Sequence, residues 1–228
     1  MTDLQRNREE LLAEIGQAAT LAGRKPEDIK LMAVSKTHPF SAIQELYGCG
    51  QLVFGENRVQ EVEQKFPSLR PSLMQVHLIG HLQTNKAKKA LELFDGIDSV
   101  DSLKLAQKLE ALAEKPVSIL LELRTAPEET KSGFENETEL FRALDVLSTF
   151  SNVRVKGLMT IGPLHGNEKE IREAFSLLRE TAERAKVRFS HLDFSTLSMG
   201  MSSDFRLAIA EGSTQIRVGS RLFGKREA

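Results

Sequence analysis

The chain of 228 residues contains one cysteine, one tyrosine and no tryptophan, and neither sign of charge is in excess. A single cysteine, Cys49, excludes an internal disulfide framework and a thiolate-rich zinc site. With 31 basic and 32 acidic side chains the formal net charge is −1, which argues against a broad basic face for nucleic acid.

Long apolar runs are missing as well. No segment approaches the ~20 apolar residues that cross a bilayer. Residues 1–14 are charged throughout and lack the apolar core of a signal peptide. The histidines show no metal-ligand spacing. We therefore expect a cytoplasmic protein that binds neither membrane, nor nucleic acid, nor metal.

Short apolar runs alternate with helical patterns along the chain. Apolar residues recur every three to four positions over 4–22, which predicts a helix before the first run. The runs predict eight strands, at 31–34, 52–54, 76–79, 96–100, 117–123, 153–158, 192–197 and 215–218. Helices are predicted between them at 39–49, 56–66, 82–94, 105–112, 140–147, 171–182 and 204–210.

Eight strand–helix units in about 200 residues fit an α/β fold, a single (β/α)8 TIM barrel with an extra N-terminal helix. We expect residues 1–228 to form one domain, because no linker or low-complexity segment interrupts the pattern. A doubly wound open sheet is the alternative that alternation alone leaves open.

Polar clusters follow the predicted strands, at the end where a parallel barrel carries its chemistry. Lys36 stands out because an apolar run leads up to it, which places its stem at the barrel rim. Desolvation there disfavours the ammonium form, and a neutral amine forms a Schiff base with a carbonyl. The alternative is a lysine that reaches solvent or pairs with a carboxylate such as Glu56.

Segments 198–203 and 219–220 contain serine and glycine and follow the last two predicted strands. Such loops, with a helix N-terminus, suit a phosphate group, although Ser202 or Ser203 as a helix cap is a compatible alternative. A lysine amine and a phosphate site together indicate a phosphorylated carbonyl compound. Pyridoxal 5′-phosphate and the sugar phosphate of a Schiff-base aldolase both satisfy this description.

Six motifs occur in order: AVSKT (33–37), FGENRVQE (54–61), HLIGHLQTNK (77–86), GLMT (157–160), LSMGMSSD (197–204) and IRVGSRLFG (216–224). Together they resemble the pyridoxal phosphate homeostasis protein family, from about residue 4 to residue 226. The resemblance implies a barrel similar to the N-terminal domain of alanine racemase. It also implies a protein that binds pyridoxal phosphate (PLP) and takes part in its intracellular homeostasis.

The same resemblance implies the binding residues. Lys36 would hold the cofactor as a Schiff base, Arg217 would face the pyridine nitrogen, and Asn57 would help to position the ring. Phosphate contacts would come from Ser202, Gly219 and Ser220, with Ser198, Gly200 and Met201 shaping the same cup.

Arg217 also bears on catalysis, because an arginine stays protonated and leaves the ring a poorer electron sink. Alanine racemase takes a second base, a tyrosine, from a C-terminal domain that we do not expect here. The one tyrosine, Tyr47, lies in a predicted outer helix. The prediction is a monomer that buffers PLP or delivers it to apo-enzymes without efficient catalysis. A low-activity PLP-dependent amino-acid racemase and the aldolase are the alternatives.

Two positions depart from the family pattern. Arg124 stands where relatives usually have asparagine, seven residues before Lys131, and is expected to narrow the pocket mouth or contact an anion. Ser220 replaces the usual threonine and is expected to preserve phosphate binding. His77 lies inside an apolar strand and is expected to be a hydrogen-bonded core histidine.

Overall fold

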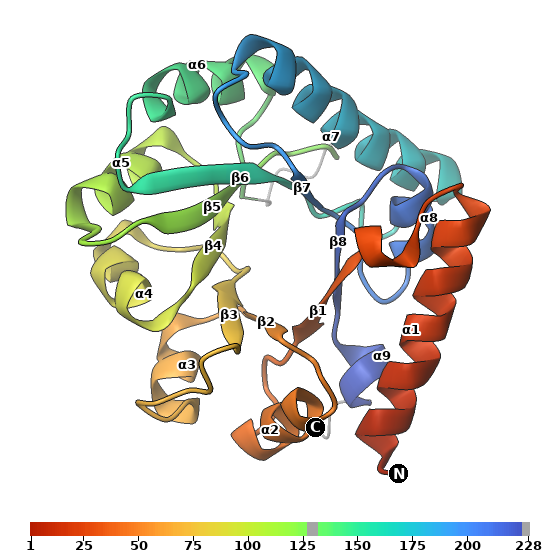
Figure 1. Ribbon diagram of the computed structural model, residues 1–228. Helices are drawn as coiled ribbons and strands as arrows, with labels where there is room; N and C mark the ends of the chain where they lie inside the picture. Colours follow the sequence, from red (N-terminus) through yellow and green to blue (C-terminus); the bar gives the residue numbers. More distant parts are fainter. Residues whose placement is uncertain (127–131, 225–228) are drawn as a thin grey trace.

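The computed structural model describes residues 1–126 and 132–224, in which eight parallel strands close into a barrel in sequence order (Figure 1). The strands are β1 (Lys30–Val34), β2 (Val53–Glu56), β3 (Gln75–Leu78), β4 (Gly96–Val100), β5 (Val117–Glu122), β6 (Val153–Met159), β7 (Thr196–Ser198) and β8 (Gln215–Val218). The predicted TIM barrel is confirmed, and the open sheet is wrong.

Helices surround the barrel, and the expected N-terminal helix α1 (Asp3–Leu21) packs beside α8 and α9 (Figure 1). The others are α2 (Phe40–Gly48), α3 (Val59–Lys65), α4 (Ala87–Leu93), α5 (Leu103–Leu112), α6 (Glu137–Leu147), α7 (Glu168–Arg188), α8 (Phe205–Ala210) and α9 (Ser220–Phe223). Two 3-10 turns, η1 (Pro26–Asp28) and η2 (Thr84–Lys86), precede β1 and α4.

The strands owe their apolar character to burial on both faces. Every residue of β2, β4 and β8 is buried, because helices cover one face of each strand and the barrel interior covers the other. Neighbouring strands approach closely at Gly157, where a Cβ atom would lie 1.8 Å from the carbonyl oxygen of Thr196. Only glycine fits between β6 and β7 at this position.

Several predicted boundaries differ from those of the structure, and two of the differences have a clear physical reason. Glu56 belongs to β2 and is fully buried, so α3 begins at Val59 and not at the predicted residue 56. The seventh strand covers only Thr196–Ser198, because the apolar residues before it pack in the core without strand pairing, as Phe194 does. The short helix α9 was not predicted.

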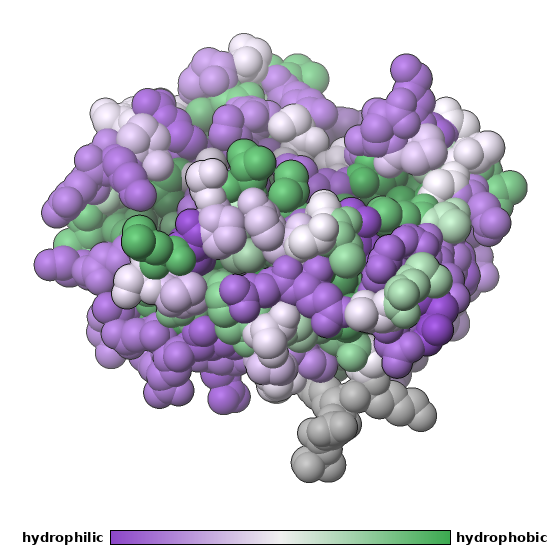
Figure 2. Space-filling view, turned by 60° about the horizontal axis from the view of Figure 1, so that its bottom comes forward, coloured by the Kyte–Doolittle hydropathy of each residue, from purple (hydrophilic) through white to green (hydrophobic). Residues whose placement is uncertain are grey.

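The surface carries no large apolar region on the face shown in Figure 2, where apolar residues form small groups among hydrophilic ones. The most exposed large apolar side chains include Leu21, Leu164 and Val187 on separate parts of the chain, Leu69 and Leu73 in one loop, and Met1 at the start of the chain. Among the described helices, none is long and apolar enough to cross a bilayer.

Glu110 ties α5 to the start of β6. Its carboxylate accepts hydrogen bonds of 2.8–3.2 Å from the backbone N–H groups of Ser151, Asn152 and Val153. Burial raises the pKa of Glu110, but the three backbone donors together favour the ionised form more strongly, so its pKa lies below the ordinary value.

We predict that Glu110→Gln lowers the free energy of unfolding by about 1–3 kcal/mol at neutral pH. A depressed pKa contributes stability above the ordinary glutamate value of about 4.3, and this contribution is lost as the pH falls through the folded-state pKa. Urea denaturation at a series of pH values should therefore give free energies of unfolding for the two proteins that converge as the pH becomes acidic. A difference that stays constant down to acid pH would contradict the assignment.

Candidate functional site

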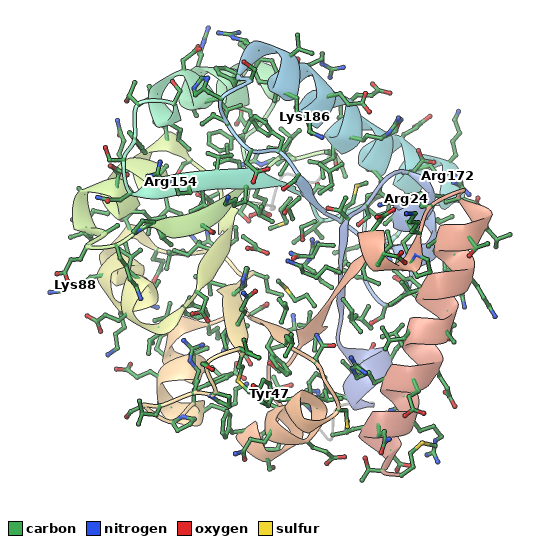
Figure 3. All side chains as sticks on the ribbon, in the orientation of Figure 1. Arg24, Tyr47, Lys88, Arg154, Arg172 and Lys186 are labelled. Carbon is green, nitrogen blue, oxygen red and sulfur yellow. The ribbon has the colours of Figure 1, made fainter. Side chains whose placement is uncertain are left out.

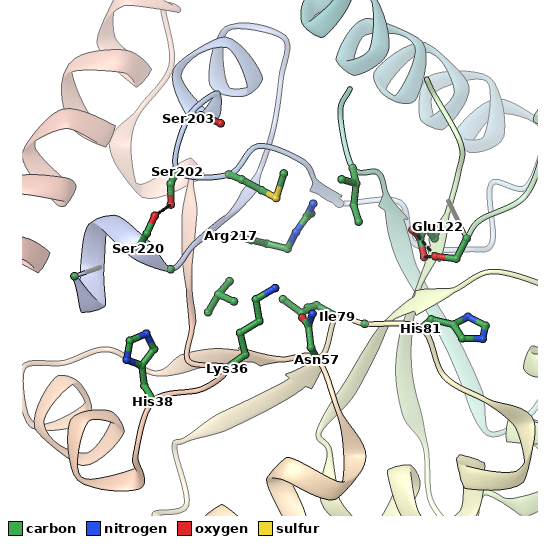
Figure 4. A pocket seen from close by; sticks show the side chains of 17 residues that line it. Lys36, His38, Asn57, Ile79, His81, Glu122, Ser202, Ser203, Arg217 and Ser220 are labelled. Atoms are coloured by element: carbon green, nitrogen blue, oxygen red, sulfur yellow. Dashed lines mark hydrogen bonds between the residues drawn. The ribbon is translucent and has the colours of Figure 1, made fainter. Parts of the chain in front are cut away.

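A cavity of about 580 Å³ opens at the carboxyl ends of the strands (Figure 4). It is lined by Val34, Lys36, His38, Asn57, Ile79, Gly80, His81, Glu122, Ser132, Ile161, Met201, Ser202, Ser203, Arg217, Gly219, Ser220 and Gly224. Seven of the nine predicted binding residues are in this lining: Lys36, Asn57, Met201, Ser202, Arg217, Gly219 and Ser220. Residues far apart in the sequence thus meet in one space.

Lys36 follows β1 and directs its side chain into the cavity, on the same side as Asn57 (Figure 4). The carboxylate of Glu56, considered as its partner, contacts a different lysine. Lys65 Nζ lies 2.6 Å from Glu56 Oε1, and the Ser35 hydroxyl donates to the same oxygen at 2.6 Å. Lys36 therefore contributes an amine to the cavity lining, whereas the charge of Glu56 is balanced by Lys65.

Arg217 is almost fully buried, with 4% of its surface exposed. Its guanidinium donates to the carbonyl and hydroxyl oxygens of Ser198 at 2.7 and 2.8 Å and to the carbonyl oxygen of Thr160 at 2.7 Å. Burial lowers the pKa of Arg217, while the nearby carboxylates of Asp98 and Glu122 act in the opposite direction. These contacts fix the orientation of the guanidinium in the cavity wall.

The loops after β7 and β8 form a cup of hydroxyl and backbone groups. Ser202 Oγ and Ser220 Oγ lie 3.2 Å apart (Figure 4). No acceptor among the described residues takes the backbone N–H of Ser202, Ser203 or Ser220. A Cβ atom at Gly219 would lie 3.2 Å from the carbonyl oxygen of Val34, which is a tight contact, so glycine suits this position. Such a group of unsatisfied donors suits an anion.

The N-terminus of α8 shows how these serines stay available. Asp204 occupies the N-cap position, and its carboxylate accepts from the backbone N–H of Met201 at 2.5 Å. The alternative in which Ser202 or Ser203 caps this helix is therefore wrong. Helices α8 and α9 have only six and four residues, so the cup depends on hydroxyl and local N–H groups more than on a helix dipole.

Ser198 and Gly200 lie behind the lining. The Ser198 hydroxyl is fully buried and accepts from Arg217 and, at 3.2 Å, from Gln215 Nε2. Gly200 has a φ of +95°, and a Cβ atom there would lie 2.5 Å from the Cβ of Ala208. The two residues shape the cup indirectly, through the position of Arg217 and the packing of α8.

A hydrogen-bonded chain runs through the barrel from His77 to Arg217. His77 Nδ1 lies 2.8 Å from Asp98 Oδ1, and Gln215 Nε2 donates to Asp98 Oδ2 at 2.9 Å and to Ser198 Oγ. Burial lowers the pKa of His77, but Asp98 raises it more strongly, so the net direction is upward. The hydrogen bond predicted for His77 is confirmed, and its side chain is partly buried, with 17% of its surface exposed.

The other side of the cavity carries a residue that the sequence did not single out. Glu122 at the end of β5 is 3% exposed, and the Ser132 hydroxyl lies 3.0 and 3.1 Å from its two oxygens. Burial raises the pKa of this carboxyl. Lys36 was identified as a charged residue at the end of an apolar run. Glu122 shows the same signal, since it follows the apolar run of β5.

Arg124 does not line the cavity, and its guanidinium lies 3.9 Å from Glu135 Oε1. The described residues therefore give no support for Arg124 narrowing the mouth of this cavity, and a contact with an anion stays a prediction. Lys131, the reference point for this departure, lies outside the described residues.

An amine, a fixed guanidinium and a cup of hydroxyl and N–H groups line one cavity, and this arrangement suits a phosphorylated carbonyl compound. The class of protein follows from comparison, because residues 7–227 match the family described as alanine racemase, N-terminal domain.

Relatives that are similar over nearly their full length identify the family within this class. The pyridoxal phosphate homeostasis protein of Aquifex aeolicus is 40% identical over 222 residues, 95% of this chain and 96% of that protein. That of Escherichia coli K12 is 39% identical over 236 residues, 100% and 98% of the two chains. PipY of Synechococcus elongatus PCC7942, solved with PLP bound, has a TM-score of 0.81 at 40% identity and covers 92% and 100%. The chain belongs to the pyridoxal phosphate homeostasis protein family.

Proposed function

We propose that this protein binds pyridoxal 5′-phosphate in the described cavity, as a Schiff base on Lys36, and takes part in intracellular PLP homeostasis. One observation carries the proposal: the Lys36 amine and the Ser202–Ser220 cup line the same cavity. An amine suits an aldehyde, and hydroxyl groups beside unsatisfied N–H donors suit a phosphate. The PLP-bound relative and the names of the curated relatives support the same ligand.

The covalent step needs only the lysine and water. The neutral amine of Lys36 attacks the aldehyde carbon and forms a C=N bond. The two amine protons leave with the aldehyde oxygen as water, so nothing is oxidised or reduced. Water or another amine reverses the bond by attack at the same carbon. Reversibility is what a protein that stores and releases the ligand requires.

The remaining residues would orient the ligand. Ser202, Gly219 and Ser220 would hold the phosphate, with Met201 beside them, and Asn57 would lie along the ring. Arg217 would face the pyridine nitrogen. When bound, PLP supplies an aldehyde and an electron-withdrawing ring. An arginine does not give its proton to the ring nitrogen, so the ring withdraws electrons less strongly.

We propose accordingly that the protein is a carrier without efficient catalysis. Tyr47, the tyrosine of the chain, lies on α2 and does not line the cavity (Figure 3). We expect amino acids incubated with the loaded protein in deuterated water to keep their α-hydrogen, as followed by NMR. Rapid exchange that Lys36→Ala abolishes would instead favour the racemase.

We further propose that residues 1–228 form one domain and act as a cytoplasmic monomer that supplies PLP to apo-enzymes. A single closed sheet with one contiguous core supports one domain. The scattered positions of the exposed apolar side chains support a monomer. A single cysteine agrees with a reducing compartment.

The first test removes the amine. Lys36→Ala should abolish covalent attachment of PLP, because Lys36 is the one lysine among the described residues that line this cavity. Borohydride reduction followed by peptide mass spectrometry should locate the adduct at position 36 in the wild-type chain. Lys88→Ala, an exposed position on α4, is the matched control and should leave the adduct in place. An undiminished adduct in Lys36→Ala would overturn the proposal.

The second test separates the phosphate cup from the amine. Ser202→Ala with Ser220→Ala should weaken PLP binding about tenfold or more, since each hydrogen bond to a charged group contributes about 1.5–3 kcal/mol. Pyridoxal, which lacks the phosphate, should bind both proteins with affinities that agree within about twofold. Titration followed by absorbance gives both constants. Equal losses for the two ligands would show that the serines do not contact phosphate.

A further inference from the structure

The motif at 54–61 contains two carboxylates that the cavity does not use. Only Asn57 of this motif lines the cavity, whereas Glu56 and Glu61 lie beneath the segment that carries Lys36. We propose that Glu56, Glu61 and Lys65, here called the brace, position the Lys36 amine by holding the backbone on both sides of it. The inference rests on the proposed function, because it concerns the residue that would bind PLP.

The brace holds Ser35, the residue before Lys36, at two points. Lys65 Nζ donates to the Ser35 carbonyl oxygen at 3.0 Å, and the Ser35 hydroxyl donates to Glu56 Oε1 at 2.6 Å. Lys65 also donates to Glu56 Oε1 at 2.6 Å and to Glu61 Oε1 at 2.9 Å. An ammonium group has three donors, and here all three are used.

The brace holds Thr37, the residue after Lys36, at its backbone. The backbone N–H of Thr37 donates to Glu61 Oε1 at 2.6 Å. Thr37 has a φ of +69°, the one positive φ of a non-glycine residue among those described. A β-branched residue is strained in this conformation, and such strain persists only where the surroundings impose it. The hydrogen bond to Glu61 stabilises the strained turn directly after Lys36.

Stability alone does not explain the brace. The Glu56 side chain is fully buried and that of Lys65 is 10% exposed, and burying an ion pair costs about as much free energy as the attraction returns. Glu56 Oε2 is buried with no partner among the described residues, which adds a further cost. Burial raises the pKa of Glu56, opposed by Lys65. A costly arrangement around one lysine is typical of a positioning role.

Loss of the brace should therefore affect the amine more than the phosphate cup. Glu61→Ala removes the acceptor of the Thr37 N–H, and Glu61→Gln keeps an oxygen at that place. Glu63→Ala is the matched control, because Glu63 lies on the same helix in an exposed pair with Lys89. Lys65→Met leaves Glu56 buried without its partner and can unfold the chain, so Glu61→Ala is the deciding variant.

Two readouts apply to these variants. In the ligand-free protein, amide hydrogen exchange at Thr37 should be about tenfold faster or more in Glu61→Ala, because a local hydrogen bond is lost. With PLP added, borohydride-trapped attachment at Lys36 should be about tenfold slower, because the amine is no longer held in place. Glu61→Gln should recover part of both effects, and Glu63→Ala should match the wild-type chain. Unfolding midpoints identify any variant that fails to fold.

The outcomes separate the two proposals. Wild-type rates of exchange and attachment in a folded Glu61→Ala protein would overturn the brace and leave the proposed function intact. Failure of the wild-type chain to attach PLP at Lys36 would overturn the proposed function. The exchange of Thr37 in ligand-free protein would still decide whether Glu61 holds the turn.

Discussion

Closure of the sheet is the constraint on which the site depends. Ala33 of β1 pairs with Phe54 of β2 on one side and with Val218 of β8 on the other, so the first and last strands are neighbours. Because all strands are parallel, their carboxyl ends lie on one rim. Lys36 and the Gly219–Ser220 turn, from opposite ends of the chain, therefore line the same cavity.

The charged side chains inside the barrel next to the cavity have hydrogen-bond partners. Arg217, Asp98 and Gln215 are each at least 96% buried and are joined through Ser198 by hydrogen bonds. A buried charge without such partners is costly in free energy. The hydrogen bonds therefore hold these side chains in one orientation inside the barrel. Beneath Lys36, the brace meets the same requirement with an ion pair. Both arrangements present a nitrogen group to the cavity from a rigid support.

The fold was predictable because eight short apolar runs reflect strands that are buried on both faces. Lys36 and the cup were predictable because polar groups that follow such runs must lie on one rim. The end of β2 was not, since Glu56 is charged and its burial depends on Lys65, whose tertiary contacts no local pattern reveals.

The most direct test of the account is a crystal structure of the protein grown with PLP. The account predicts continuous electron density from Lys36 Nζ to the ligand, with the phosphate against Ser202, Gly219 and Ser220 and the pyridine nitrogen beside Arg217. Ligand density without a bond to Lys36, or a phosphate bound away from the two serine loops, would contradict it.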